Sequence, residues 1–205
     1  MVTQYAFFFD ASACSGCKAC QVACKDRNDL GPGMLWRRVY EVTGGEWERK
    51  GGAWVPALAV YNISMACNHC LKPVCGLSCP VKAVWKRDDG IVLIDAARCI
   101  GCRYCEWACP YGSIRFDLMT NTVSKCDFCV DAVEAGEPPA CVAACPERAL
   151  DFGDLDDLRR RYGEVRTVHP LPDPGQTDPA IIIKPHRDSS RAAEKKAEVS
   201  NWEEV

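Results

Sequence analysis

Sixteen cysteines in this 205-residue chain fall into four groups of four, and their spacing constrains the fold more than any other feature. Two groups share the pattern C-x2-C-x2-C-x3-C, the second group widens one gap, and the fourth contains a long loop. In chain order the groups are Cys14, Cys17, Cys20 and Cys24; Cys67, Cys70, Cys75 and Cys79; Cys99, Cys102, Cys105 and Cys109; and Cys126, Cys129, Cys141 and Cys145. Such spacing is typical of ligands to cubane iron-sulfur clusters, so four groups predict four clusters.

The recurrence of cysteine at every third position has a geometric reason. Three thiolates must converge on three corners of one cube, and a tight loop can arrange them at this spacing. In two-cluster ferredoxins the fourth cysteine of each motif binds the partner cluster, so the motifs work in pairs. A proline follows Cys79, Cys109 and Cys145, as in the ferredoxin motif, whereas Lys25 follows Cys24.

Two other uses of cysteine have to be weighed. A disulfide framework is typical of small secreted chains, and in this longer chain near-neighbour cysteines would compete for the same partners. Zinc ribbons use two C-x2-C pairs, so cysteines at every third position oversupply a tetrahedral site. A zinc site formed by the fourth group alone is still an alternative, because its cysteines resemble two spaced pairs. A zinc-stabilised interaction scaffold is therefore the alternative from a different functional class.

Composition bounds the remaining possibilities. The chain is 48% hydrophobic, but so many cysteines lie in loops that the clusters must form part of the core. We therefore expect the apoprotein to be poorly folded. The formal net charge of −3 gives no indication of nucleic-acid binding. The apolar patch at residues 5–9 predicts a strand rather than a signal sequence, and no segment approaches the roughly twenty apolar residues of a membrane span.

An internal repeat follows the second cysteine group. Residues 84–94 predict two short strands around an Asp-Asp-Gly turn, and the third cysteine group comes next. The same order returns at residues 113–124, with a turn near Asn121, before the fourth group. The repeat predicts an α+β fold made of two pseudo-symmetric units that are similar to bacterial ferredoxins.

Two segments lie outside this repeat. Within residues 25–66, the runs 35–42 and 54–64 predict an inserted β-hairpin, which either docks a partner protein or shields a cluster from water. Its tryptophans Trp36, Trp47 and Trp54 are interpreted as packing residues. Residues 154–162 carry acids first and arginines last, which predict a short helix. The tail beyond is either disordered or an arm that wraps a partner subunit, and Ile181-Ile182-Ile183 favours the arm.

Several stretches beside the cysteines resemble the corresponding stretches of a known protein family. They are Gln4-Tyr5 with Phe7-Phe8-Phe9-Asp10, Ala23-Cys24-Lys25-Asp26, Cys67-Asn68-His69-Cys70, Cys99-Ile100-Gly101-Cys102-Arg103-Tyr104-Cys105, Ala108-Cys109-Pro110-Tyr111-Gly112, Ala149-Leu150-Asp151-Phe152-Gly153 and Ile183-Lys184-Pro185. Over nearly its whole length the chain resembles the four-cluster iron-sulfur subunits of complex molybdopterin oxidoreductases, and most closely those of the dimethyl sulfoxide reductase type.

The resemblance implies that the first cysteine group pairs with the fourth and the second with the third. It implies four ligand sets: quartet A (Cys14, Cys17, Cys20, Cys145), quartet B (Cys24, Cys126, Cys129, Cys141), quartet C (Cys67, Cys70, Cys75, Cys109) and quartet D (Cys79, Cys99, Cys102, Cys105). Some relatives have tryptophan at the position of Cys102 and a three-iron cluster there. Because cysteine occupies that position here, four 4Fe-4S clusters are expected.

This pairing divides the chain into four expected parts. One ferredoxin-like unit combines residues 1–24 with residues 113–153, and the other spans residues 67–112. Residues 25–66 form the hairpin insert between them. Residues 154–205 comprise the C-terminal helix and the partner-wrapping tail.

The function implied by the resemblance is electron transfer without a catalytic centre. Single electrons pass between a molybdopterin-containing catalytic subunit and an integral membrane, quinol-oxidising anchor subunit. The equivalent subunit of a formate dehydrogenase, hydrogenase, or polysulfide or thiosulfate reductase is the alternative. Such subunits contact the cytoplasmic membrane only through partners, often on its periplasmic face and in some relatives on its cytoplasmic face.

Four side chains beside the ligands are candidates for further roles. Lys18, Arg103 and Lys125 either raise the reduction potentials of their clusters or are ordinary solvated surface cations. His69 donates a hydrogen bond to a cluster, contacts a partner's quinone site, or packs in the interior. No Ser-His-acid constellation, phosphate loop or flavin motif stands out, so the sequence predicts no catalytic residues.

Overall fold

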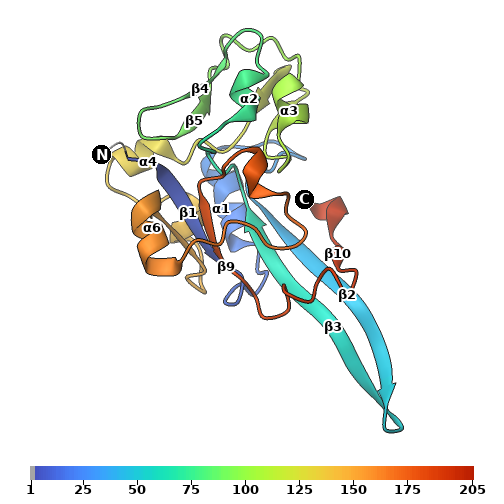
Figure 1. Ribbon diagram of the computed structural model, residues 1–205. Helices are drawn as coiled ribbons and strands as arrows, with labels where there is room; N and C mark the ends of the chain where they lie inside the picture. The colour runs from blue at the N-terminus through green and yellow to red at the C-terminus, as the bar shows by residue number, and fades with distance from the viewer. Residues whose placement is uncertain (1–2) are drawn as a thin grey trace.

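A three-stranded sheet built from distant parts of the chain forms the centre of the molecule (Figure 1). The computed structural model describes residues 3–205. The middle strand β1 (Tyr5–Asp10) pairs antiparallel with β8 (Leu150–Asp154) and parallel with β9 (Ile181–Lys184). Because β1 is covered on both faces, its aromatic run is apolar throughout instead of alternating. The predicted N-terminal strand is thereby confirmed.

Helix α6 (Leu155–Tyr162) covers one face of this sheet. The sequence predicted this helix over residues 154–162. The helix begins at Asp154, whose carboxylate accepts hydrogen bonds from the backbone N–H groups of Asp156 and Asp157 at 3.0 and 3.3 Å. Leu155 and Leu158 pack against the sheet, and the Tyr162 ring stacks on Phe8 with 3.7 Å between centroids. This capping and apolar stripe explain why so short a segment is helical.

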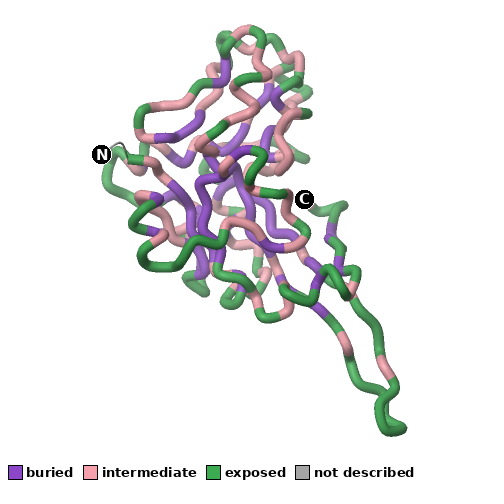
Figure 2. The backbone as a smooth tube through the Cα atoms, viewed as in Figure 1, coloured by how far each residue is buried: buried purple, intermediate pink, exposed green. Residues whose placement is uncertain are grey.

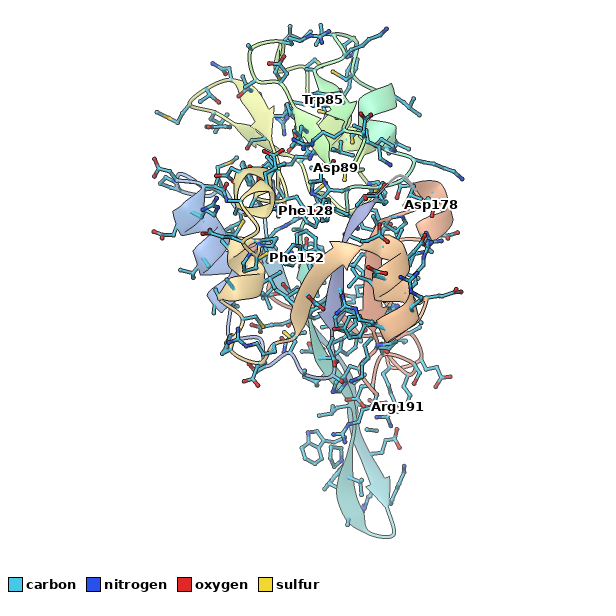
Figure 3. All side chains as sticks on the ribbon, turned by 90° about the vertical axis from the view of Figure 1, so that its left-hand side faces the viewer. Trp85, Asp89, Phe128, Phe152, Asp178 and Arg191 are labelled. Atoms are coloured by element: carbon cyan, nitrogen blue, oxygen red, sulfur yellow. The ribbon has the colours of Figure 1, made fainter. Side chains whose placement is uncertain are left out.

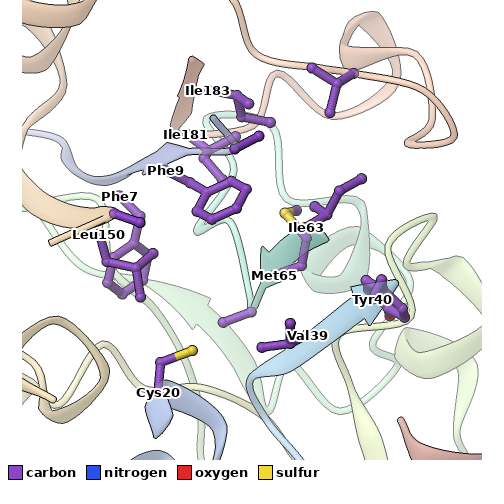
Figure 4. Packing of buried hydrophobic residues seen from close by; sticks show 14 of the residues in the cluster. Phe7, Phe9, Cys20, Val39, Tyr40, Ile63, Met65, Leu150, Ile181 and Ile183 are labelled. Atoms are coloured by element: carbon purple, nitrogen blue, oxygen red, sulfur yellow. The ribbon is translucent and has the colours of Figure 1, made fainter. Parts of the chain in front are cut away.

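The opposite face of the sheet contributes to the main core, which also contains cysteines (Figure 4). Phe7 and Phe9 pack there with Val39, Ile63 and Met65. Five cysteines belong to the same buried cluster: Cys20, Cys67, Cys126, Cys141 and Cys145. Thiols are thus part of the interior, as expected for a chain whose clusters contribute to its core.

A long hairpin projects from this body (Figure 1). Its strands β2 (Arg38–Lys50) and β3 (Ala53–Met65) have 13 residues each, which is longer than the predicted runs. Gly51 and Gly52 form the turn with φ of +58° and +84°, values that suit a two-residue hairpin turn. Figure 2 shows the base buried and the tip exposed.

The tryptophans of this region do not behave alike. Trp47 is 58% exposed and Trp54 is 66% exposed, so the interpretation of these two as packing residues is wrong. Trp36 is half-buried, packs against the main core, and donates a hydrogen bond from Nε1 to Ser124 Oγ at 3.0 Å. This difference in exposure follows from the length of the hairpin, because only the base of the hairpin contacts the body of the protein.

The two predicted short hairpins are present beside the cysteine loops. They are β4 (Val84–Lys86) with β5 (Val92–Ile94), and β6 (Arg115–Asp117) with β7 (Thr122–Ser124). Ile114 and Val123 pack with Val84, Val92 and Cys105 in one small core. Residues 114–123 therefore pack with the second and third cysteine groups, and the expected boundary at residue 113 divides side chains that lie together.

The C-terminal tail lies along its own chain. After η1 (Pro174–Gln176), strand β9 enters the central sheet, so the run of isoleucines is not an isolated segment. Strand β10 (Glu198–Val199) then pairs with β2, and η2 (Trp202–Glu204) ends the chain. Figure 3 shows Arg191 beside the hairpin, where its guanidinium donates to Leu58 O at 3.5 Å. That the tail also wraps a partner stays a prediction.

Short helices follow the cysteine loops. They are α1 (Ala19–Arg27), α2 (Val74–Leu77), α3 (Tyr104–Ala108), α4 (Val130–Glu134) and α5 (Ala140–Ala143). Among residues 3–205, no helix is both long and apolar enough to cross a membrane. The fold as a whole is small and mixes helices with strands.

Candidate metal-cluster sites

Three of the four quartets each line a cavity of similar size. Open solvent at the mouth included, the cavity volume is about 370 Å³ at quartet C, about 310 Å³ at quartet A and about 290 Å³ at quartet D. Each cavity combines three cysteines of one group with a single cysteine of another: Cys109 in quartet C, Cys145 in quartet A and Cys79 in quartet D. The structure thus brings together cysteines from the first and fourth groups, and from the second and third.

The cysteines of quartet B also lie near one another. Burial raises the pKa of the Cys24 thiol to about 12, and the charges of Cys141 and Cys129 add to this rise against the opposing effect of Arg37. Cys126 is buried, and its pKa is raised by burial and then by Cys24 and Cys67. Helix α1, which carries Cys24, packs against α5, which carries Cys141.

The loops present backbone N–H groups toward the sulfurs. In every cysteine group the residue two positions after the first cysteine has positive φ: Gly16 at +75°, His69 at +41°, Gly101 at +68° and Phe128 at +68°. The backbone N–H groups of Gly101 and Phe128 donate to the sulfurs of Cys99 and Cys126 at 3.5 and 3.4 Å. Backbone N–H groups in such turns form concave anion-binding nests, a device found at many iron-sulfur sites.

The sequence contained part of this signal. A left-handed turn favours glycine, which occupies positions 16 and 101. His69 and Phe128 adopt the same backbone conformation although both carry a Cβ atom. Nothing in their residue types indicates it. The repeat appears only when the four loops are compared in space.

The thiols have the chemistry that a metal cluster requires. Burial raises the pKa values of Cys70 and Cys75 to about 12, so in the absence of a cation these thiols hold their protons at neutral pH. Iron binding would replace those protons and place the thiolates in an apolar cavity, where a free thiolate is costly. Cys79 differs: burial opposes ionisation, but backbone N–H groups, led by that of Val84, lower its pKa.

Comparison with known proteins agrees with this chemistry. A family model described as a 4Fe-4S dicluster domain matches residues 58–155, which hold the second, third and fourth cysteine groups. The sequence is 46% identical over 205 residues to one chain of the anaerobic dimethyl sulfoxide reductase of Escherichia coli K12, and the match covers 100% of both. It belongs to the family of dimethyl sulfoxide reductase iron-sulfur subunits. The protein thus carries multiple 4Fe-4S clusters, as the motifs predicted.

More distant members of the family serve other reductases. The sequence is 36% identical over 189 residues to one subunit of the tetrathionate reductase of Salmonella typhimurium, with 91% of this chain and 70% of the relative covered. It is 34% identical over 191 residues to one chain of the polysulfide reductase of Wolinella succinogenes, with coverage of 91% and 97%. Family membership therefore does not by itself fix the terminal substrate.

The three predicted cations have different surroundings. Lys125 is only 4% exposed and donates from Nζ to the carbonyl oxygens of Val92 and, at 3.0 Å, Cys126. It lines the quartet C cavity, so the surface-cation interpretation is wrong for this residue. Lys18 is partly exposed and pairs with Glu41 at 3.1 Å and with Glu204.

Arg103 resembles Lys18 in having a carboxylate partner. Its Nε donates to Glu106 at 2.6 Å, and its guanidinium lies 4.9 Å from the centre of the Phe116 ring. The paired carboxylates offset the positive charges of Lys18 and Arg103. Of the three, Lys125 therefore presents the least compensated charge to a cluster.

His69 lies fully inside the protein, 0% exposed. Its Nδ1 accepts a hydrogen bond from the Val92 N–H at 3.0 Å, which places the proton of the neutral ring on Nε2. Burial is the main cause that holds its pKa well below the ordinary value. The ring meets Phe128 edge-on at 5.1 Å. Packing is therefore observed, and complete burial argues against contact with a partner subunit.

Proposed function

We propose that this chain relays single electrons through four 4Fe-4S clusters held by quartets A, B, C and D. A bound 4Fe-4S cluster accepts and releases one electron at a time. The main support is that three similar cavities are each lined by a complete cysteine quartet drawn from two groups. The chain contributes ligands, backbone donors and buried charge, and it carries out no reaction on a substrate.

The arrangement of the quartets supports a single row in the order A, B, C, D. Cys141 of quartet B lies close enough to Cys20 of quartet A to add to the rise that burial causes in the pKa of Cys20. Cys67 of quartet C likewise adds to the rise that burial causes in the pKa of Cys126 of quartet B. Cys75 and Cys109 of quartet C and Cys79, Cys99 and Cys105 of quartet D pack in a shared apolar core around Val84 and Ile114. Each expected cluster would thus neighbour the next along the row.

We propose further that the cysteine loops form two pseudo-symmetric ferredoxin-like units with residues 25–66 as an insert between them. Repeated local geometry supports this. Lys82 and Arg148, each three residues after the fourth cysteine of its group, both have φ of +51°. The N–H groups of Ala83 and Ala149 then donate to the sulfurs of Cys79 and Cys145 at 3.2 and 3.3 Å.

The proposed partners are a molybdopterin-containing catalytic subunit and an integral membrane, quinol-oxidising anchor subunit of a dimethyl sulfoxide reductase-type complex. Similarity over the full length of a component of that enzyme supports this assignment. The protein would be peripheral to the cytoplasmic membrane, on its periplasmic face, with the cytoplasmic face as the alternative. A tetrathionate or polysulfide reductase-type complex is the second candidate, supported by the more distant relatives.

Low-temperature EPR with iron and sulfide analysis tests the proposal on anaerobically purified protein titrated with dithionite. About sixteen irons per chain and several interacting reduced-cluster signals are expected for four cubane clusters. Little iron with stoichiometric zinc in folded protein would overturn it. The identity of the large subunit that co-purifies with the chain then separates the dimethyl sulfoxide reductase-type complex from the second candidate.

A further inference from the structure

The guanidinium of Arg37 is buried near cysteines of two of the expected cluster sites. The residue lies one position before β2 and is only 2% exposed. Burial acts to lower its pKa, but the thiolates of Cys141, Cys20, Cys126 and Cys24 more than offset this effect. These cysteines belong to quartets A and B. The guanidinium therefore faces both sites at once.

The hydrogen bonds of Arg37 leave most of its guanidinium without protein acceptors. Nη1 donates to Ser64 Oγ at 3.1 Å and to Ser64 O at 3.3 Å. Within residues 3–205, Nε and Nη2 find no hydrogen-bond acceptor. The Phe7 ring covers one side at 4.8 Å. Burying an arginine in this way costs free energy unless a nearby negative charge compensates its positive charge.

Ser64 connects Arg37 to a ligand of quartet A. Its hydroxyl lies 3.3 Å from the sulfur of Cys20. Because Ser64 Oγ accepts from Arg37, its own proton is free to point at that sulfur. Both Arg37 and Ser64 oppose the rise in the pKa of Cys20 that burial causes, so both favour negative charge on its sulfur.

We propose that Arg37 is the shared counter-charge of the clusters at quartets A and B and raises the reduction potentials of both. This inference rests on the proposed function, because it requires clusters at these two sites. Each reduction adds one negative charge close to a fixed positive charge in a water-poor interior, so Arg37 stabilises the reduced state more than the oxidised state. Ser64 extends the effect to the cluster at quartet A through its hydrogen bond.

The neighbouring arginine provides a matched control. Arg38 is also buried, but it donates to the carbonyl oxygens of Tyr111 and Gly112 at 3.1 and 2.6 Å and faces Cys109 of quartet C. Arg37→Met removes the charge between quartets A and B, and Arg37→Lys keeps it. Arg38→Met makes the same chemical change beside a different quartet. Ser64→Ala removes only the hydrogen bond toward Cys20.

Redox titrations followed by EPR, on the complex that contains the full chain, give the decisive readout. In Arg37→Met two of the four midpoint potentials should fall, with at least a tenfold lower ratio of reduced to oxidised cluster at a fixed potential, or about 59 mV for one electron. Arg37→Lys should stay close to the wild type. Arg38→Met should leave those two midpoints unchanged, and Ser64→Ala should lower one of them.

Four unchanged midpoints in a fully loaded Arg37→Met variant, or an equal fall in all four, would overturn the inference. If Arg37→Met does not retain iron, Ser64→Ala decides: one lowered midpoint supports the inference and four unchanged midpoints overturn it. Iron analysis of the wild type keeps the two proposals apart. Well under about sixteen irons per chain in the wild type contradicts the proposed function itself.

Discussion

Cys145 lines the same cavity as Cys14, although the two residues lie near opposite ends of the cysteine-containing region. The loop that carries Cys145 reaches this cavity because β8, which follows it, pairs with β1, which precedes the first cysteine group. The central sheet thereby joins the first and fourth groups. Which cysteines share a cluster is a consequence of strand pairing as well as of local spacing.

Paired cysteine substitutions test this sharing. Cys17→Ser combined with Cys145→Ser should lose about four irons, no more than either substitution alone, because both remove ligands from one cluster. Cys129→Ser combined with Cys145→Ser should lose about eight, because two clusters are affected. Iron and sulfide analysis of each variant measures the difference. Additive loss in the first pair would contradict the assignment of Cys145 to quartet A.

Removal of iron should unfold much of the chain. Cys20, Cys126, Cys141 and Cys145 lie in the main core, so cluster loss leaves buried thiols around empty space. A chelator under reducing conditions should abolish the cooperative thermal transition measured by circular dichroism. Falling pH should speed iron release, because protons compete with iron for thiols such as Cys24 and Cys70, whose pKa values are raised to about 12. An apoprotein with an unchanged transition would contradict this prediction.

Gly101→Ala should be clearly more destabilising than Gly136→Ala. Both glycines have positive φ, at +68° and +81°, so each substitution should cost about 1 kcal/mol in backbone strain. A methyl group at Gly101 would also lie 2.3 Å from the carbonyl oxygen of Asn121, whereas nothing lies within 4 Å at Gly136. We expect the thermal midpoint to fall by about 2–4 °C for Gly136→Ala and by at least twice that for Gly101→Ala. Equal shifts would show that the Asn121 contact is relieved without cost.

The C-terminal tail should be ordered in the chain without its partners. Asn201 donates to Val39 O at 3.0 Å and accepts from the Glu41 N–H at 2.9 Å, which ties η2 to the hairpin base. Hydrogen exchange should therefore show protection over residues 197–200. Asn201→Ala should reduce this protection, at a cost of about 1–3 kcal/mol for the buried groups it leaves unpaired. Glu198→Ala, at an exposed residue of the same segment, is the control. An unprotected tail in the wild type would indicate that partners order it.

Local patterns account for the elements that could be predicted. The helix at residues 154–162 depends on a cap, an apolar stripe and a terminal glycine, all within ten residues of one another. The small hairpins beside the cysteine loops depend on turns such as Asp88-Asp89-Gly90. The exposure of Trp47 and Trp54 could not be predicted, because the same β-forming residues occur in buried and projecting hairpins.

Partners that are distant in sequence explain what was missed. Strand β9 has the composition of many strands, but its parallel pairing with β1 requires two segments far apart in the chain to meet. The pair Arg37-Arg38 has the composition of an exposed basic site. The burial of Arg37 accompanies its contacts with Phe7 and Ser64, and that of Arg38 accompanies its contacts with Tyr111 and Gly112, and no short window of sequence contains these partners.

The sequence by itself determined the chemistry of this protein, because the number of cysteines and their spacing specify the ligands to iron-sulfur clusters within single loops. Only the tertiary structure decided which buried charge faces those ligands. Arg37 lies near cysteines of quartets A and B, and Lys125 lines the cavity of quartet C. Lys18 and Arg103 also line cavities, but carboxylates offset their charges. The physical reason is range: most ligands of each cluster come from one short stretch of sequence, but the electrostatic environment is set by every segment that the fold brings near.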